Sequence, residues 1–168
     1  MSYLVIRNLS ARLKRTPYRV LRDVSLTVNA GEVRGLVGES GAGKSMIGKA
    51  ILGTLPNSIE ITSGEILLGG TDLLILPPSQ RRSLIGATCA LIPQDPLTAL
   101  NPSRRIGPQI TDRLVDILHW SRPDAEARAR QILAEVHIPE AERVLRSYPH
   151  ELSGGMRQRI LIASAFAA

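Results

Sequence analysis

The sequence predicts an α/β fold in which a β region and a strand–loop–helix unit precede a helical segment. Residues 3–9 and 21–28 are rich in β-branched and aliphatic side chains, which is the composition of strands. Residues 33–37 form a short apolar segment that leads into a glycine-rich loop and then into apolar residues at helical spacing. Further along, residues 106–118 repeat apolar side chains with the period of a helix. These observations indicate a mixed domain rather than an all-α or all-β one.

The first half of the chain is expected to alternate strands and helices. Residues 33–37 are predicted to be a short buried strand that feeds the loop. Residues 44–55 are predicted to be a helix, because aliphatic residues recur at helical spacing: Ile47, Ile51, Leu52 and Leu55. After a break at 56–58, we expect a short strand within 63–70, a brief helix at 78–85 and a buried strand at 89–92.

The second half is expected to be helical. Apolar residues share one face of a first predicted helix, namely Ile106, Ile110, Leu114, Ile117 and Leu118. Pro123 stands where the next helix can start, and a second stripe follows it: Ala129, Ile132, Leu133 and Val136. Because apolar side chains at helical spacing usually mark a packed core, we interpret both stripes as packing faces rather than ligand sites.

Composition describes an ordinary globular protein. The chain has 168 residues with 43% hydrophobic content, and no apolar stretch approaches the roughly 18 residues that a membrane-spanning helix needs. The net charge is +6, but the basic residues are scattered. One Phe, one Trp and three Tyr provide few platforms for stacking on bases. We therefore interpret the charge as a mixed, solvated surface, and no nucleic-acid partner is expected.

One octapeptide fits the phosphate-binding pattern G-x-x-x-x-G-K-[ST] at every fixed position: Gly38, Glu39, Ser40, Gly41, Ala42, Gly43, Lys44 and Ser45. Its glycines let backbone N–H groups approach phosphate oxygens. The lysine supplies a mobile charge for the β/γ-phosphates, and the serine hydroxyl can sit on a magnesium ion. A flexible loop that matches by chance is the alternative, but the flanking strand and helix predictions disfavour it. The loop predicts a site for a nucleoside triphosphate.

A second motif lies near the C-terminus, where Ser153, Gly154 and Gly155 precede a helix predicted over residues 156–168. Ser153 is a good N-cap, and the glycines leave backbone N–H groups exposed at the helix start, as an anion-binding site requires. An ordinary Ser-Gly-Gly cap without a ligand is the alternative. The phosphate-binding loop in the same chain favours the anion-binding interpretation.

With these motifs in order, the chain resembles the ATP-binding subunits of ABC transporters. The octapeptide resembles their Walker A loop, residues 152–159 (Leu-Ser-Gly-Gly-Met-Arg-Gln-Arg) resemble their signature motif, and Gln94 matches their Q-loop glutamine. Residues 94–102 and 148–155 are similar to dipeptide, oligopeptide and nickel importers. The resemblance implies a P-loop NTPase fold with an N-terminal antiparallel β region. It further implies one partial ATP-binding domain over residues 1–168, divided into a β and P-loop core (1–100), a helical subdomain (101–150) and a signature segment (151–168).

The resemblance also implies a mechanism with ATP and Mg²⁺ as cofactors. Residues 38–45 would wrap the phosphates, with Lys44 on the β/γ-phosphates, and Ser45 and Gln94 would hold the metal. Ser153, Gly154 and Gly155 would touch the γ-phosphate bound on a second ATP-binding subunit, identical or different. Tyr18 is the candidate for stacking on adenine, although a loop tyrosine is the competing interpretation. Integral membrane permease subunits and, indirectly, a solute-binding protein are the further implied partners, at the cytoplasmic face of the membrane.

One part of the family pattern is not found. No acidic pair follows an apolar strand after Ser153, and none of the three histidines stands where the family's switch histidine would. We therefore expect a sheet that is incomplete at the C-terminus, a fragment of a longer ATPase rather than a natural short form, and little or no ATP hydrolysis by this polypeptide alone. A non-hydrolysing regulatory module and a soluble ABC protein acting on nucleic acid or ribosomes are the alternatives to an importer ATPase.

Overall fold

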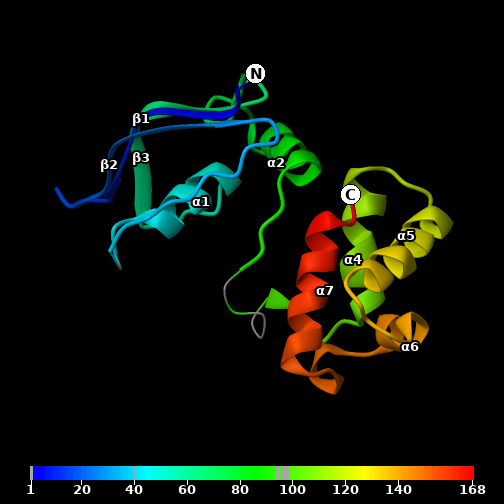
Figure 1. The fold of residues 1–168 in the computed structure, drawn as a ribbon. Helices are drawn as coiled ribbons and strands as arrows, with labels where there is room; N and C mark the ends of the chain where they lie inside the picture. The colour runs from blue at the N-terminus through cyan, green and yellow to red at the C-terminus, as the bar shows by residue number, and fades with distance from the viewer. Residues whose placement is uncertain (1, 40, 94, 96–98) are drawn as a thin grey trace. The chain divides into compact units, whose positions relative to one another are not determined.

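The computed structural model describes residues 2–39, 41–93, 95 and 99–168 of the chain. They divide into two compact units, unit 1 ending at Arg82 and unit 2 beginning at Ser83 (Figure 1). Each unit is described by itself. Unit 1 holds the β structure and the glycine-rich loop, and unit 2 is helical.

Unit 1 is built on an antiparallel sheet with strand order β2-β1-β3-β4. Its strands are β1 (Ser2–Leu13), β2 (Arg19–Asn29), β3 (Ile59–Leu68) and the short β4 (Thr71–Asp72). The predicted strands at 3–9, 21–28 and 63–70 are thus confirmed and longer than expected. Ser2 pairs with Asn29, and Leu13 pairs with Ile59, so β1 is the central strand of the long ones. Ile6, Leu9 and Ile66 are fully buried at its core.

A crease crosses the three long strands at one level. Asn8 in β1 and Asp23 in β2 both have φ of 50°, and Gly64 in β3 has φ of 97°. The register of β1 against both neighbours shifts at this level, as at a β-bulge. Side chains satisfy the displaced backbone: the Asn8 N–H donates to Ser25 Oγ (2.9 Å), and Asn8 Nδ2 donates to Asp23 Oδ1 (2.8 Å).

Two helices complete the described elements of the first half, α1 (Lys44–Leu52) and α2 (Pro78–Thr88). The predicted helix after the loop is confirmed but ends three residues early, because Gly53 adopts a left-handed C-cap with φ of 69°. Arg81 of α2 holds this end, since its Nη2 donates to the Ala50 carbonyl at 2.9 Å. The helix that follows the loop is therefore fastened at its C-terminus.

Two predicted strands are wrong. Residues 33–37 and 89–92 have no strand structure, and Val33 and Val37 are 97% and 100% exposed. Leu91 is also exposed, at 64%. Apolar composition predicts a strand only where neighbouring strands accept and donate its backbone hydrogen bonds. Among the described residues, no strand pairs with either segment, so both run as irregular chain.

Unit 2 is a helical cluster around one core. Its elements are α4 (Ile106–Asp112), a π-helical turn η1 (Arg113–Ile117), α5 (Arg122–Glu135), α6 (Ala141–Arg146), a 3₁₀ turn η2 (Pro149–Glu151) and α7 (Gly154–Phe166). The core includes Ile106, Ile110, Leu114, Leu133 and Ile160. The predicted packing stripes are largely confirmed, but the π turn rotates Ile117 outward, so that it is 37% exposed.

Helix termini in unit 2 follow the capping rules. Ser121 caps α5, because its Oγ accepts the Asp124 N–H, and Pro123 occupies the first turn as predicted. Gly107 lets α4 approach α6: a Cβ at this position would lie 3.0 Å from the Leu145 carbonyl oxygen. No helix among the described residues is both long and apolar enough to cross a bilayer.

Candidate functional site

The glycine-rich loop adopts the backbone that its composition predicts. Gly41 and Gly43 have φ of 86° and 87°, a left-handed conformation that glycine alone adopts without strain. Gly43 is the N-cap of α1, and its carbonyl accepts the N–H groups of Met46 (2.9 Å) and Ile47 (3.1 Å). Ser40 lies outside the described residues. The loop thus turns directly into the start of a helix.

Gly43 also permits a close approach to β2. A Cβ at Gly43 would lie 3.1 Å from both Leu21 Cδ2 and the Val20 carbonyl oxygen. This contact brings the loop to the first residues of β2. Tyr18 stands only two residues before Val20, and its side chain is 64% exposed. At roughly 3.3 Å per extended residue, Tyr18 is within about 7 Å of the loop's contact point along the chain.

Lys44 places its charge over the loop. Its Nζ donates to the carbonyl oxygens of Gly38 (2.6 Å) and Glu39 (2.7 Å). Ser45 follows in the first turn of α1 and is exposed. The first N–H groups of a helix have no intrahelical acceptor and carry the positive end of the helix dipole. The loop and the first turn of α1 thus supply an ammonium group, N–H groups and a hydroxyl, and this donor set fits a polyphosphate with its magnesium ion.

The remaining predicted site residues are Gln94 and the segment 153–155. Gln94 lies outside the described residues. Ser153 caps α7 as predicted, since its Oγ accepts the Met156 N–H at 3.3 Å. Gly154 and Gly155 are exposed, and a Cβ at either position would meet no atom within 4 Å. The glycine-rich loop belongs to unit 1 and this cap to unit 2.

Two arginines, Arg128 and Arg113, cap the C-terminal end of α7. Arg128 donates from Nε to the Ala167 carbonyl (3.0 Å) and from Nη2 to the Phe166 carbonyl (3.1 Å). Arg113 donates from Nε to Gly86 (2.8 Å) and from Nη1 to Ala165 (3.3 Å). Cations suit a helix C-terminus. No local sequence signal identifies these bonds, because 38 or more residues separate Arg128 and Arg113 from the α7 carbonyls they cap.

Known proteins are similar in sequence to this chain over almost all of its length. The family model described as ABC transporter matches residues 21–168. A probable D,D-dipeptide transport ATP-binding protein of Escherichia coli (strain K12) is 49% identical over 148 residues, which are 88% of this chain and 45% of that protein. A dipeptide transport ATP-binding protein of Haemophilus influenzae is 40% identical, over 99% of this chain and 51% of its own length. The chain therefore spans about half the length of the curated relatives it matches.

Solved structures agree with the fold. The ATP-binding subunit of an ABC transporter superposes with a TM-score of 0.76 at 30% identity, over 98% of this chain and 62% of that one. A dimeric ATP-binding cassette in a post-hydrolysis state, bound to ADP and Pi, gives a TM-score of 0.81 at 24% identity, over 98% of this chain and 69% of that one. The predicted α/β fold of the ABC ATPases is confirmed. The chain belongs to the ABC transporter family.

Proposed function

We propose that this chain binds magnesium-ATP through residues 38–45 and serves the import of dipeptides or oligopeptides across the cytoplasmic membrane. The observation that carries the proposal is the position of Lys44, whose ammonium group lies over a glycine loop at the start of α1. The transported solute is inferred from the relatives, which are described as dipeptide or oligopeptide transport ATP-binding proteins. Nickel and related solutes are further candidates on the resemblance of residues 94–102.

Each loop residue has a proposed role. The backbone of Gly38, Glu39, Ser40, Gly41, Ala42 and Gly43 would surround the phosphates, and Lys44 would exchange its carbonyl partners for β/γ-phosphate oxygens. Ser45 and Gln94 would hold the metal, which neutralises developing negative charge when bound. Tyr18 would stack on adenine, because its exposed ring lies close in the chain to the contact between Gly43 and β2.

The signature segment is proposed to act on nucleotide held by a second ATP-binding subunit. A Cβ at Gly154 or Gly155 would meet open space, so no packing among the described residues requires glycine there. Each glycine destabilises a helix by roughly 0.5–1 kcal/mol relative to alanine. An external ligand that approaches the backbone closely explains why they are present. A dimeric cassette among the similar structures supports the pairing.

Further partners follow from the same assignment. Integral membrane permease subunits and, through them, a solute-binding protein are proposed, with this chain on the cytoplasmic face of the membrane. After Ser153 the sequence contains no Asp or Glu. In P-loop NTPases an acidic side chain helps to hold the metal. We infer that the 168-residue polypeptide by itself binds ATP but hydrolyses it slowly or not at all.

The test is ATP affinity by calorimetry in magnesium buffer for the 168-residue chain and two lysine variants. Lys44→Ala should weaken binding at least about tenfold, since hydrogen bonds from a charged group contribute about 1.5–3 kcal/mol each. Lys49→Ala is the matched control, because Lys49 lies on the same helix in its last turn and is exposed. Equal affinities for the wild-type chain and Lys44→Ala would contradict the proposal. Circular dichroism confirms that each variant is folded.

The transport role needs its own measurement. The tagged chain should co-purify with integral membrane subunits from its source membrane, and ATP-dependent uptake of labelled dipeptide should require Lys44. Co-purification with nucleic acid or ribosomes instead would identify the chain as a soluble ABC protein.

A further inference from the structure

Unit 2 contains a cavity of about 300 Å³, bounded by α4, α5 and α6. Charged side chains line it: Arg105, Arg122, Arg130, Arg146, Glu126 and Glu142. No residue of the glycine-rich loop or of the segment 153–155 takes part. This volume is at the lower end of the range for small-molecule sites in proteins.

Helical spacing brings the charges together. Arg122, Glu126 and Arg130 are four residues apart on α5, so they share one face of that helix. Glu142 and Arg146 are four residues apart on α6. Each helix therefore presents a charged stripe toward the same cavity, a convergence that the sequence does not reveal because it depends on how α5 and α6 pack.

The two carboxylates of the cavity are already engaged. Glu142 accepts a hydrogen bond from Arg130 Nε and lies 3.9 Å from Arg146 Nη2. Glu126 lies 3.9 Å from Arg130. Among the described residues, no carboxylate forms an ion pair with Arg105 or Arg122. Four guanidinium groups thus face two carboxylates, and the cavity carries an excess of positive charge.

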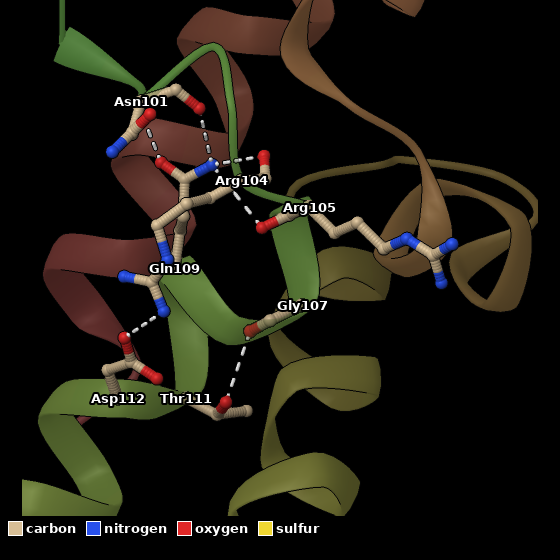
Figure 2. Close-up of polar contacts among 7 residues, drawn as sticks. All are labelled: Asn101, Arg104, Arg105, Gly107, Gln109, Thr111 and Asp112. Carbon is tan, nitrogen blue, oxygen red and sulfur yellow. Dashed lines mark hydrogen bonds and ion pairs between the residues drawn. The ribbon is translucent and has the colours of Figure 1, made fainter.

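The position of Arg105 is set from two directions. Its guanidinium carbon lies 5.7 Å from the centre of the Tyr148 ring, within cation–π range. Its carbonyl accepts a hydrogen bond from Gln109 Nε2 (3.3 Å), which also holds the carbonyls of Asn101 and Arg104. Figure 2 shows the Arg105 side chain extending away from this network, whereas the Arg104 side chain turns back to Asp112. Two adjacent arginines therefore have different surroundings, and only Arg105 lines the cavity.

Small residues leave the cavity open between the charges. Gly107 and Ala129 contribute little or no side chain, and the Thr111 hydroxyl is engaged because it donates to the Gly107 carbonyl at 3.2 Å. The lining thus combines small and apolar residues with four guanidinium groups and two carboxylates. Planar guanidinium groups bind the oxygens of carboxylates and phosphates in pairs.

We propose that this cavity binds a small organic anion that carries a phosphate or carboxylate group, with Arg105 and Arg122 as its principal ligands. This site is separate from the nucleotide loop, and its occupant is identified only by the oxyanion that both classes share.

The experiment uses the 168-residue chain labelled with ¹⁵N and two probes, inorganic phosphate and succinate. Titrations follow the Nε–Hε signals of Arg105 and Arg122 and the amide signals of α5. A saturable shift with either probe at concentrations up to about 50 mM supports the site, since weak anion sites have affinities in this range. The probe that binds more tightly distinguishes a phosphate ligand from a carboxylate ligand.

Variants separate this cavity from other anion sites. The double variant Arg105→Gln/Arg122→Gln should weaken binding at least about tenfold. Arg143→Gln is the matched control, because Arg143 lies on α6 but pairs with Glu140 outside the cavity. Lys44→Ala should leave the shifts at α5 unchanged. Shifts that are confined to residues 38–45, or that are equal in the double variant and the wild-type chain, would overturn the proposal, as would the lack of any saturable shift.

Discussion

Replacing Gly155 by alanine should stabilise unit 2, whereas replacing Gly107 by alanine should leave its stability unchanged or lower it. Both glycines lie in the first turn of a helix, Gly155 in α7 and Gly107 in α4. Their surroundings differ. A Cβ at position 155 meets open space, whereas at position 107 it would lie 3.0 Å from the Leu145 carbonyl oxygen, which belongs to a helix backbone and has little freedom to move.

The magnitudes follow from these contacts. Alanine in place of helical glycine stabilises by about 0.5–1 kcal/mol, so Gly155→Ala should raise the free energy of unfolding by that amount. At position 107 the same gain is set against overpacking, which costs about 1–3 kcal/mol. Gly107→Ala should therefore range from neutral to about 2.5 kcal/mol less stable. The sign of the difference between the two variants does not depend on the values chosen within these ranges.

Urea unfolding followed by tryptophan fluorescence measures both variants in the same unit. The chain has a single Trp, Trp120, whose backbone N–H donates to the Leu114 carbonyl within unit 2. If Gly155→Ala lowers the unfolding midpoint, α7 needs that glycine for its own fold, and the argument for an external ligand there fails. A stabilised Gly107→Ala would show that α6 is not as close to α4 as the structure has it.

Three further outcomes are expected. Gly64→Ala should speed hydrogen exchange in β1 far more than Gly70→Ala. Both positions have positive φ, but a Cβ at Gly64 would lie 2.5 Å from Leu9 Cα, whereas a Cβ at Gly70 would meet open space. Equal effects of the two substitutions would show that the strands are not in close backbone contact at the crease. The hydrogen bond from Arg130 holds the pKa of Glu142 below its ordinary value. Glu142→Gln should therefore lower the free energy of unfolding at neutral pH, and the difference between variant and wild type should disappear as the pH falls through the lowered pKa. Urea midpoints measured from about pH 7 down to about pH 3 test this sign. Arg128→Met should increase hydrogen exchange at the C-terminal end of α7 and leave the exchange rates of its first turn unchanged, because Arg128 caps the Phe166 and Ala167 carbonyls.

Local chemistry accounts for what the sequence could predict. The left-handed Gly43, the helix from Lys44 and the Ser153 cap depend on residues within a few positions of one another. The failures at Val33–Val37 and 89–92 are non-local, because an apolar segment becomes a strand only beside a partner strand. The arginine cavity is non-local too: Arg105, Arg122 and Arg146 are dispersed along the chain and converge only through helix packing.

The crease at Asn8, Asp23 and Gly64 also bears on how the sheet assembles. Aliphatic strands such as β1 and β3 present similar side chains at many alignments, and a one-residue slip would exchange their buried and exposed faces. Only one alignment places all three unusual backbone residues at the same level, where Asn8 can bond Asp23 and Ser25. Any slipped pairing would press ordinary side chains against the backbone that Gly64 accommodates. The crease therefore favours the observed register of the sheet over slipped pairings.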